Sequence, residues 1–382
     1  MAKRVPLAWL QLKHEKLRLV AAVSGIAFAV VLILMQLGFE YAAATASALV
    51  PAKLRGDIIL ISKQYDYVLF SKEFPRRRLD QALAFDGVES AWPVYLAMAQ
   101  WKNPEDLHER AILVIGCDPA GKVMDVGAVD ASLLRLPDTF LFDAGSRLEY
   151  GPIAKLVAEK GSIRAELNGR NVQVVGLFRM GASVGINGTL LTSDTNFLGA
   201  IQGHTENLVE VGVIRLKPGA DAAKVREALG RGLPPDVTVL PHDSFVEKEA
   251  NYWGQHTGVG YIFSLGVFMG LVVGAVIVYQ ILYTDVNDHI AEYATLKAMG
   301  YSNAYLASVV LKESLLLSIL GFVPGLGIAQ ALYTATQRAT LLPMEMTPQR
   351  IVAVLILTIV MCGGSALLAI RKLQQAHPAD IF

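Results

Sequence analysis

The chain has 382 residues, of which 53% are hydrophobic and only 18% are charged. Its 34 lysines and arginines balance 34 aspartates and glutamates, and no basic face with interleaved aromatic residues is visible. This balance excludes nucleic acid as an expected partner. The two cysteines, Cys117 and Cys362, fall in segments that we expect in different compartments, so no disulfide is expected between them.

Four long apolar runs are the strongest signal: Leu19–Phe39, Val259–Tyr283, Leu315–Tyr333 and Ile351–Ile370. Each approaches the roughly 20 apolar residues that a helix needs to cross a hydrocarbon core. Only helices or closed barrels satisfy all their backbone polar groups inside lipid. We therefore expect an α+β membrane protein with four transmembrane helices and one large folded domain between the first and the second.

Basic residues predict the orientation. They gather before the first run and directly after the last, at Lys3, Arg4, Lys13, Lys16, Arg18, Arg371 and Lys372. Short segments rich in lysine and arginine stay in the cytoplasm, whereas long domains cross regardless of charge. The sequence therefore predicts a multi-pass protein of the bacterial inner membrane, with both termini cytoplasmic and the large domain in the periplasm.

A cleaved signal peptide is the alternative for the first run, because Ala46-Ser47-Ala48 resembles a cleavage site. The run Leu19–Phe39 is longer than the roughly 7–15 residues of a signal-peptide core, which favours an uncleaved anchor.

The predicted segments follow in chain order. They are a cytoplasmic amphipathic helix (1–18), the first transmembrane helix with a stalk (19–50), the periplasmic domain (51–242), a second stalk and transmembrane helix (243–283), a cytoplasmic loop (284–306), the third transmembrane helix (307–335), a short periplasmic loop (336–350), the fourth transmembrane helix (351–370) and a cytoplasmic tail (371–382). The first stalk is expected to stop at Pro51.

The periplasmic domain begins and ends with the same strand–helix–strand pattern. The six segments are Asp57–Ser62, Arg76–Phe85, Glu89–Ala97, Val209–Leu216, Ala220–Leu229 and Val237–Leu240. Two βαβ-like units favour a split, ferredoxin-like layer. The region between them, about 103–204, is rich in short β patterns such as Arg110–Gly116 and Asn171–Phe178, and is interpreted as an inserted β subdomain.

Glycines recur at four-residue spacing in the second and third apolar runs. They are Gly266, Gly270 and Gly274 in the second run, and Gly321 and Gly325 around Pro324 in the third. Small residues on one helix face allow two backbones to approach closely. Two interpretations stay open, namely packing inside the bundle and a subunit interface in a homodimer.

The cytoplasmic loop between the second and third runs has the pattern of a short helix. Asp288 and Glu292 lie near its start, Lys297 lies in its last turn, and Gly300 can terminate it. Ser302 can then cap the next helix. A rigid helix between two membrane-spanning helices would act as a lever on both.

This loop also carries a family resemblance. Glu292, Leu296, Lys297, Ala298 and Gly300 resemble the E-x-x-x-L-[RK]-A-x-G signature of FtsX/MacB-type ABC permeases. In that family the segment is the coupling helix, which docks on a cytoplasmic ATPase. The resemblance therefore implies that these residues, together with Asp288, couple the membrane helices to an ATPase.

Three further segments extend the resemblance. Glu313, next to Lys312 at the start of the third run, matches an acidic residue of the family, and the tail His377–Phe382 resembles its D-P-A-x-x-L ending, with His377 in place of Asp. The N-terminal segments Pro6–Leu12 and Met35–Phe39 resemble the DevC type, whose members act with an ATPase and a periplasmic adaptor in glycolipid or related export.

The resemblance implies a permease subunit, not an enzyme, of an ABC exporter that moves glycolipid-like or other hydrophobic cargo. Its implied partners are an ABC ATPase subunit, a periplasmic membrane-fusion adaptor, an outer-membrane channel reached through the adaptor, a second copy of the chain, and membrane lipids. No G-x-x-x-x-G-K-[ST] phosphate loop occurs, so ATP hydrolysis is expected in a separate chain and no cofactor is expected here.

Other functions of the same layout stay open. An FtsX-like regulator of a periplasmic cell-wall hydrolase is the main alternative, followed by lipoprotein release and by an ATPase-independent receptor. A secondary transporter is disfavoured, because Lys312 and Glu313 sit near a membrane boundary and the runs contain no carboxylate of their own.

Catalytic and metal sites are not expected. His242-Asp243-Ser244 contains three triad residue types, but consecutive side chains cannot form that geometry. His204, His242 and His256 lack metal-binding spacing. The glycine-rich Gly181–Gly188 is interpreted as a loop.

Overall fold

The computed structural model describes residues 16–127, 130–183, 185–255 and 258–375. These residues form two compact units, an α+β domain within 43–257 and a helical bundle built from the chain on either side of it. Most of the predicted amphipathic helix, His256 and the tail motif His377–Phe382 lie outside the described residues.

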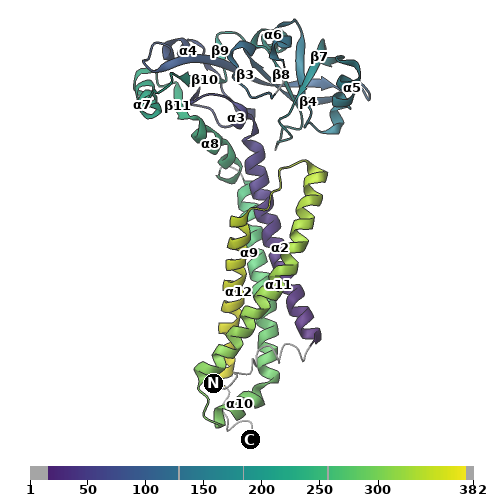
Figure 1. Ribbon diagram of the computed structural model, residues 1–382, viewed down its shortest axis with the longest axis vertical. Helices are drawn as coiled ribbons and strands as arrows, with labels where there is room; N and C mark the ends of the chain where they lie inside the picture. Colours follow the sequence, from purple (N-terminus) through teal and green to yellow (C-terminus); the bar gives the residue numbers. More distant parts are fainter. Residues whose placement is uncertain (1–15, 128–129, 184, 256–257, 376–382) are drawn as a thin grey trace. The chain divides into compact units, whose positions relative to one another are not determined.

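Among the described residues, four helices are long and apolar enough to cross a membrane: α2 (Lys16–Ser47), α9 (Gly258–Asp288), α11 (Asn303–Thr340) and α12 (Pro348–Gln375, apolar up to Arg371) (Figure 1). Each extends beyond the apolar run that predicted it, because polar residues at the ends continue the helix. The predicted fold class is confirmed, with four such helices and a large α+β domain between the first and the second.

The core of the bundle is apolar, with Ile26, Val30 and Leu34 of α2 fully buried in one cluster with residues of α9, α11 and α12. Its outer surface is equally apolar, since Ile262, Phe268 and other large side chains are more than half exposed. Such a continuous apolar exterior is costly in water and suits contact with lipid tails.

All five glycines of the predicted packing positions lie against helices of the same chain. A Cβ on Gly266, Gly270 or Gly274 would meet Gln36, Ile33 or Ala29 of α2, and Gly274 would also meet Met361 of α12. A Cβ on Gly321 or Gly325 would meet Ile26 or Val30 of α2. The small residues therefore let α9 and α11 approach α2, as the bundle-packing interpretation requires.

The α+β domain is built on a nine-stranded mixed sheet in its described residues, in the order β11-β1-β10-β3-β4-β8-β5-β7-β6. Four strands form the predicted split ferredoxin-like layer: β1 (Ile58–Ser62), β3 (Val88–Lys102), β10 (Val211–Leu216) and β11 (Val237–Pro241). Helix α4 (Arg77–Ala82) connects β1 to β3, and α7 (Ala222–Gly232) connects β10 to β11. Each βαβ unit leaves room for a strand of the other, so the two interleave.

The insertion between β3 and β10 continues the same sheet. Strand β3 runs on to Lys102, well past its predicted end at Ala97, and pairs along its second half with β4 (Glu109–Cys117). The remaining inserted strands are β5 (Thr139–Asp143), β6 (Ile163–Leu167), β7 (Arg170–Phe178) and β8 (Thr189–Thr192). Because β4 pairs in parallel with β8, and β5 with β7, the sheet is mixed.

Both faces of this sheet are buried, as alternation in β1 shows. Ile58 and Leu60 belong to one core cluster, and Ile59 and Ile61 belong to the other. The first cluster includes α4, α7, α5 (Ile153–Lys160) and α6 (Asp194–Ala200), whereas the second includes α3 (Leu49–Lys53) and α8 (His242–Gln255) (Figure 1).

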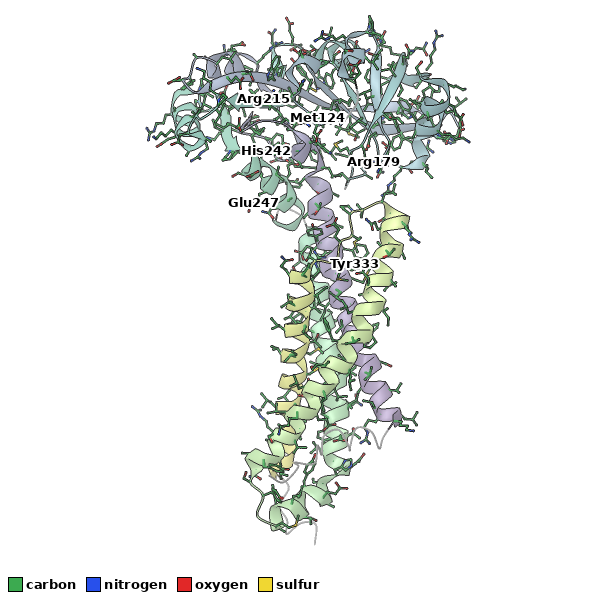
Figure 2. The ribbon with its side chains drawn as sticks, in the orientation of Figure 1. Met124, Arg179, Arg215, His242, Glu247 and Tyr333 are labelled. Carbon is green, nitrogen blue, oxygen red and sulfur yellow. The ribbon has the colours of Figure 1, made fainter. Side chains whose placement is uncertain are left out.

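Helices α3 and α8 are joined by a direct contact. His242 Nε2 lies 3.0 Å from the carbonyl oxygen of Pro51 (Figure 2). Pro51 lies inside α3, near its start, and does not end it as predicted; a proline is tolerated in a first turn because its missing N–H has no helical partner there. His242 thus links α8 to α3.

Candidate functional site

The candidate site lies where α9, α10 (Ile290–Ala298) and α11 follow one another. Helix α9 continues through the predicted loop start to Asp288, and the chain turns at His289 (φ −96°, ψ 14°) before α10 begins. The predicted loop 284–306 is therefore mostly helical. His289 Nδ1 lies 3.0 Å from the carbonyl oxygen of Asp285, a contact that holds the turn.

Charged contacts tie the start of α2 to the end of α9. Arg18 Nη1 donates to Asp285 Oδ1 over 3.4 Å, and Arg18 Nη2 contacts Asp288 Oδ2. The Asp285 side chain is almost fully buried, whereas that of Asp288 is 45% exposed. A buried carboxylate needs such a partner, so Arg18 fixes α2 against the α9 end of the site.

Helix α10 has one face buried and one exposed. Tyr293 and Ala294 are 3% and 4% exposed, and Leu296 packs against the bundle core. Glu292 and Met299 are exposed, and they share a face because they are two turns apart. The helix is therefore anchored through one side and presents the other side, with Met299 64% exposed, for contact.

The end of α10 is a tight cap centred on Gly300. Gly300 has φ +91°, its N–H donates to the Lys297 carbonyl over 2.9 Å, and the Tyr301 N–H donates to the Leu296 carbonyl over 3.1 Å. This pair of bonds is a Schellman cap, in which glycine supplies the left-handed residue. The Ser302 hydroxyl then accepts from the Tyr305 N–H over 3.2 Å and caps α11, as its position predicted.

The residues predicted from the signature fall in three environments. Asp288, Glu292, Ala298 and Gly300 are exposed, Lys297 is half-buried, and Leu296 faces the bundle. Lys312 is exposed on α11, whereas Glu313 is only 2% exposed inside the bundle. Residues 288, 292, 298, 299 and 300 are exposed on or next to α10, and we name this set the α10 face.

Sequence reasoning did not single out Arg18, Asp285, Tyr293 or Met299 for this site. Tyr293 and Met299 stand inside the signature segment, and helical spacing from Leu296 could have placed Tyr293 on the buried face. Arg18 and Asp285 are far apart in the chain, so only the packing of α2 on α9 reveals their contact.

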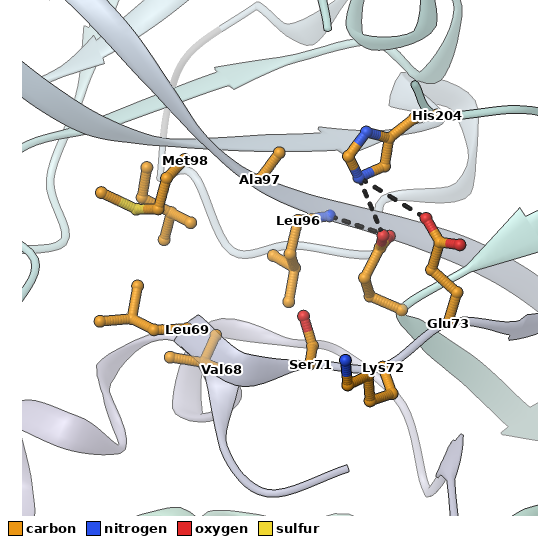
Figure 3. Close-up of a pocket in the computed structure, with 11 residues that line it drawn as sticks. Val68, Leu69, Ser71, Lys72, Glu73, Leu96, Ala97, Met98 and His204 are labelled. Atoms are coloured by element: carbon orange, nitrogen blue, oxygen red, sulfur yellow. Dashed lines mark hydrogen bonds and ion pairs between the residues drawn. The ribbon is translucent and has the colours of Figure 1, made fainter. Parts of the chain in front are cut away.

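A second cluster of chemically active residues lies in the α+β domain. Glu73, His204 and Glu210 converge at a cavity of about 290 Å³ that is also lined by Val68, Leu96 and Met98 (Figure 3). The Glu210 carboxylate raises the pKa of His204, and burial raises the pKa of Glu210. The sequence spacing had indicated no metal-ligand group around His204; the structure supplies its two carboxylate neighbours from other segments.

Comparison with known proteins finds a family match within the helical part. Residues 264–378 match the family described as FtsX-like permease C-terminal. That segment includes most of α9 and all of α10, α11 and α12. No curated protein matches the chain.

Two solved structures show limited likeness to the α+β part. The periplasmic region of MacB from Actinobacillus actinomycetemcomitans is 9% identical, with a TM-score of 0.36, covering 50% of this chain and 91% of that one. The extracellular domain of the noncanonic ABC-type transporter YknZ from Gram-positive bacteria is 14% identical, with a TM-score of 0.32, covering 48% of this chain and 98% of that one.

Proposed function

We propose that this chain, whose residues 264–378 match the FtsX-like permease C-terminal family, is the membrane subunit of an ABC exporter that acts with a separate ATPase. It would work as a homodimer, with both termini and α10 in the cytoplasm. Its cargo would be glycolipid-like or otherwise hydrophobic, and it would be passed to a periplasmic adaptor and an outer-membrane channel.

The observation that supports this proposal most directly is the two-sided placement of α10. One side is fixed to the bundle through Tyr293 and Ala294, and the other presents the exposed α10 face. Since the Gly300 cap and the Ser302 cap leave almost no slack before α11, a push on the α10 face would move α9 and α11 together. Such a geometry suits a docking helix better than a passive loop.

The chemistry of the α10 face also suits a protein partner. Glu292 offers an exposed carboxylate, Met299 offers a flexible apolar side chain, and the glycine at 300 lets a neighbour approach the backbone. ATP-driven closure of two ATPase subunits would supply the force. The long helices α2 and α9 would carry the movement along the bundle.

Affinity purification of the full-length protein from its native membrane, in mild detergent, tests the proposal. We expect an ABC ATPase and a long periplasmic adaptor to co-purify. A variant with Met299→Asp on the exposed face should lose the ATPase, while Leu148→Asp, a matched change at an exposed leucine of the α+β domain, should keep it.

Two results would contradict the exporter. Recovery of an ATPase with a cell-wall hydrolase, and no adaptor, would point instead to a regulator of that hydrolase. A folded, intact preparation that retains no ATPase under any nucleotide condition would remove the coupling role of α10.

A further inference from the structure

The three residues at the cavity of the α+β domain are brought together by a short two-stranded sheet. Strand β2 (Phe74–Pro75) pairs antiparallel with β9 (Leu208–Val209), and Phe74 lies opposite Val209. Glu73 directly precedes β2 and Glu210 directly follows β9, so the two carboxylates occupy the next position of the same pairing. Like charges placed opposite each other destabilise a strand pair unless a cation lies between them.

His204 occupies the position where such a cation would bind. Its Nε2 lies 3.2 Å from Glu210 Oε1 and 3.7 Å from Glu73 Oε1, and the three ligand-type atoms lie within 4.8 Å of one another (Figure 3). Two ligands bound tetrahedrally at zinc distances are about 3.3 Å apart. Small side-chain rotations would therefore bring all three atoms to one metal ion.

The surroundings hold these groups in place. Glu210 is 2% exposed, and its second oxygen accepts a hydrogen bond of 3.1 Å from the Leu96 N–H of β3. The His204 ring packs edge-on against Phe197, with 5.3 Å between ring centroids. Outer contacts of this kind orient metal ligands, and the contact with Leu96 uses Glu210 Oε2, not the Oε1 that meets His204.

We propose that Glu73, His204 and Glu210 form a three-ligand site for a divalent transition metal, with Zn²⁺ as the best fit. One imidazole and two carboxylates are typical zinc ligands, and together they neutralise the charge of the ion. The cavity leaves a fourth position open for water. Bound metal would join the segment before β2 to the loop before β9, two parts of the domain that are distant in sequence.

Zinc binding to the tag-free, full-length protein in detergent tests this site. After chelator treatment, isothermal titration with Zn²⁺ should give saturable binding of one ion per chain, and Co²⁺ should give the visible absorption of a tetrahedral site. Glu73→Gln and His204→Gln should each raise the Kd by more than the roughly 10–100-fold that loss of an outer contact causes.

Two matched variants serve as controls. Glu206→Gln changes an exposed carboxylate on the same segment, and His108→Gln changes an exposed histidine of the same domain. Neither should alter the Kd. If His204→Gln impairs folding, Glu73→Gln carries the test, because Glu73 is 31% exposed and outside the core.

Zinc should also raise the melting temperature of the wild-type protein and leave that of Glu73→Gln unchanged. Absence of saturable zinc binding, or equal affinity in the wild type and both ligand variants, would overturn the proposal; His204 would then balance the two carboxylates by carrying a proton. Displacement of zinc by millimolar Mg²⁺ or Ca²⁺ would overturn the assignment to a transition metal.

Discussion

Glu249 of α8 is fully buried in the α+β domain and accepts a hydrogen bond of 3.2 Å from the Val68 N–H. Burial raises its pKa from 4.5 to about 7, although Tyr65, Val68 and Lys248 act in the opposite direction. Glu249 in turn contributes to raising the pKa of the buried Tyr65, after burial itself. This carboxyl therefore titrates near neutral pH.

A pH-dependent stability follows from Glu249. Because its folded pKa is raised, the folded state favours the protonated form, and that stabilisation is complete below pH 4.5 and is lost as the pH rises through about 7. The difference amounts to about 3 kcal/mol for such a change in pKa. Denaturant unfolding followed by tryptophan fluorescence should show this loss between about pH 4.5 and 7.

The neutral isostere Glu249→Gln should remove the part of this pH dependence that Glu249 contributes, about 3 kcal/mol. The control is Glu247→Gln, an exposed carboxyl on the same helix (Figure 2), which should keep the wild-type profile. Equal profiles for the wild type and Glu249→Gln would show that another group dominates.

Gly300 leads to a second prediction at the residue scale, because its backbone has a positive φ. At φ +91° an L-residue other than glycine is strained by about 1–2 kcal/mol, and a β-branched residue by more. Gly300→Val should therefore distort the α10 cap and uncouple ATPase stimulation from transport, while the α+β domain stays folded. Reconstituted ATPase activity with and without the permease measures this effect.

Gly300→Asn provides the matched comparison, because asparagine tolerates the left-handed region better than other side chains. It should retain most of the coupling. Normal coupling in Gly300→Val would show that the cap geometry is unimportant for transmission.

At the scale of elements, the position of α10 depends on the packing of its buried face against the bundle. Leu296 packs against the core that also holds Tyr293 and Val286. An aspartate carboxylate at this position would be partly buried against apolar side chains, so Leu296→Asp should detach α10 from the bundle. We expect loss of coupling, with wild-type behaviour in Leu296→Met. ATPase stimulation at the wild-type level in Leu296→Asp would show that α10 does not need its contact with the bundle to transmit movement.

The contacts of α2 with α11 lead to a separate prediction. A Cβ at Gly321 would lie 2.5 Å from Ile26, whereas a Cβ at Gly327 on the same helix would meet nothing within 4 Å. Gly321→Leu should therefore destabilise the bundle by about 1–3 kcal/mol through overpacking, and Gly327→Leu should be close to neutral. Thermal unfolding in detergent distinguishes the two. Equal melting temperatures would contradict the packing of α11 on α2.

At the scale of the whole molecule, local patterns predicted most elements of the chain. Apolar runs predicted four membrane helices, and alternation predicted the interleaved βαβ units. The Glu292–Gly300 signature located α10, and the motifs at Gly300 and Ser302 predicted both caps. These features depend on neighbouring residues, so single-sequence reasoning can read them. The predicted ends of helices and strands were less accurate. Polar residues extend the helices beyond the apolar runs, and β3 continues to Lys102 beyond its predicted end.

The sequence by itself determined that this chain is an apolar multi-helix protein with an α+β domain and a short capped helix between its second and third apolar helices, because hydrophobic periodicity and cap chemistry act over a few residues. Only the tertiary structure decided that the glycines pack against α2, that Arg18 meets Asp285, and that Glu73, His204 and Glu210 share one cavity. Those contacts join residues far apart in the chain, and their pairing depends on sheet order and helix packing that no local pattern encodes.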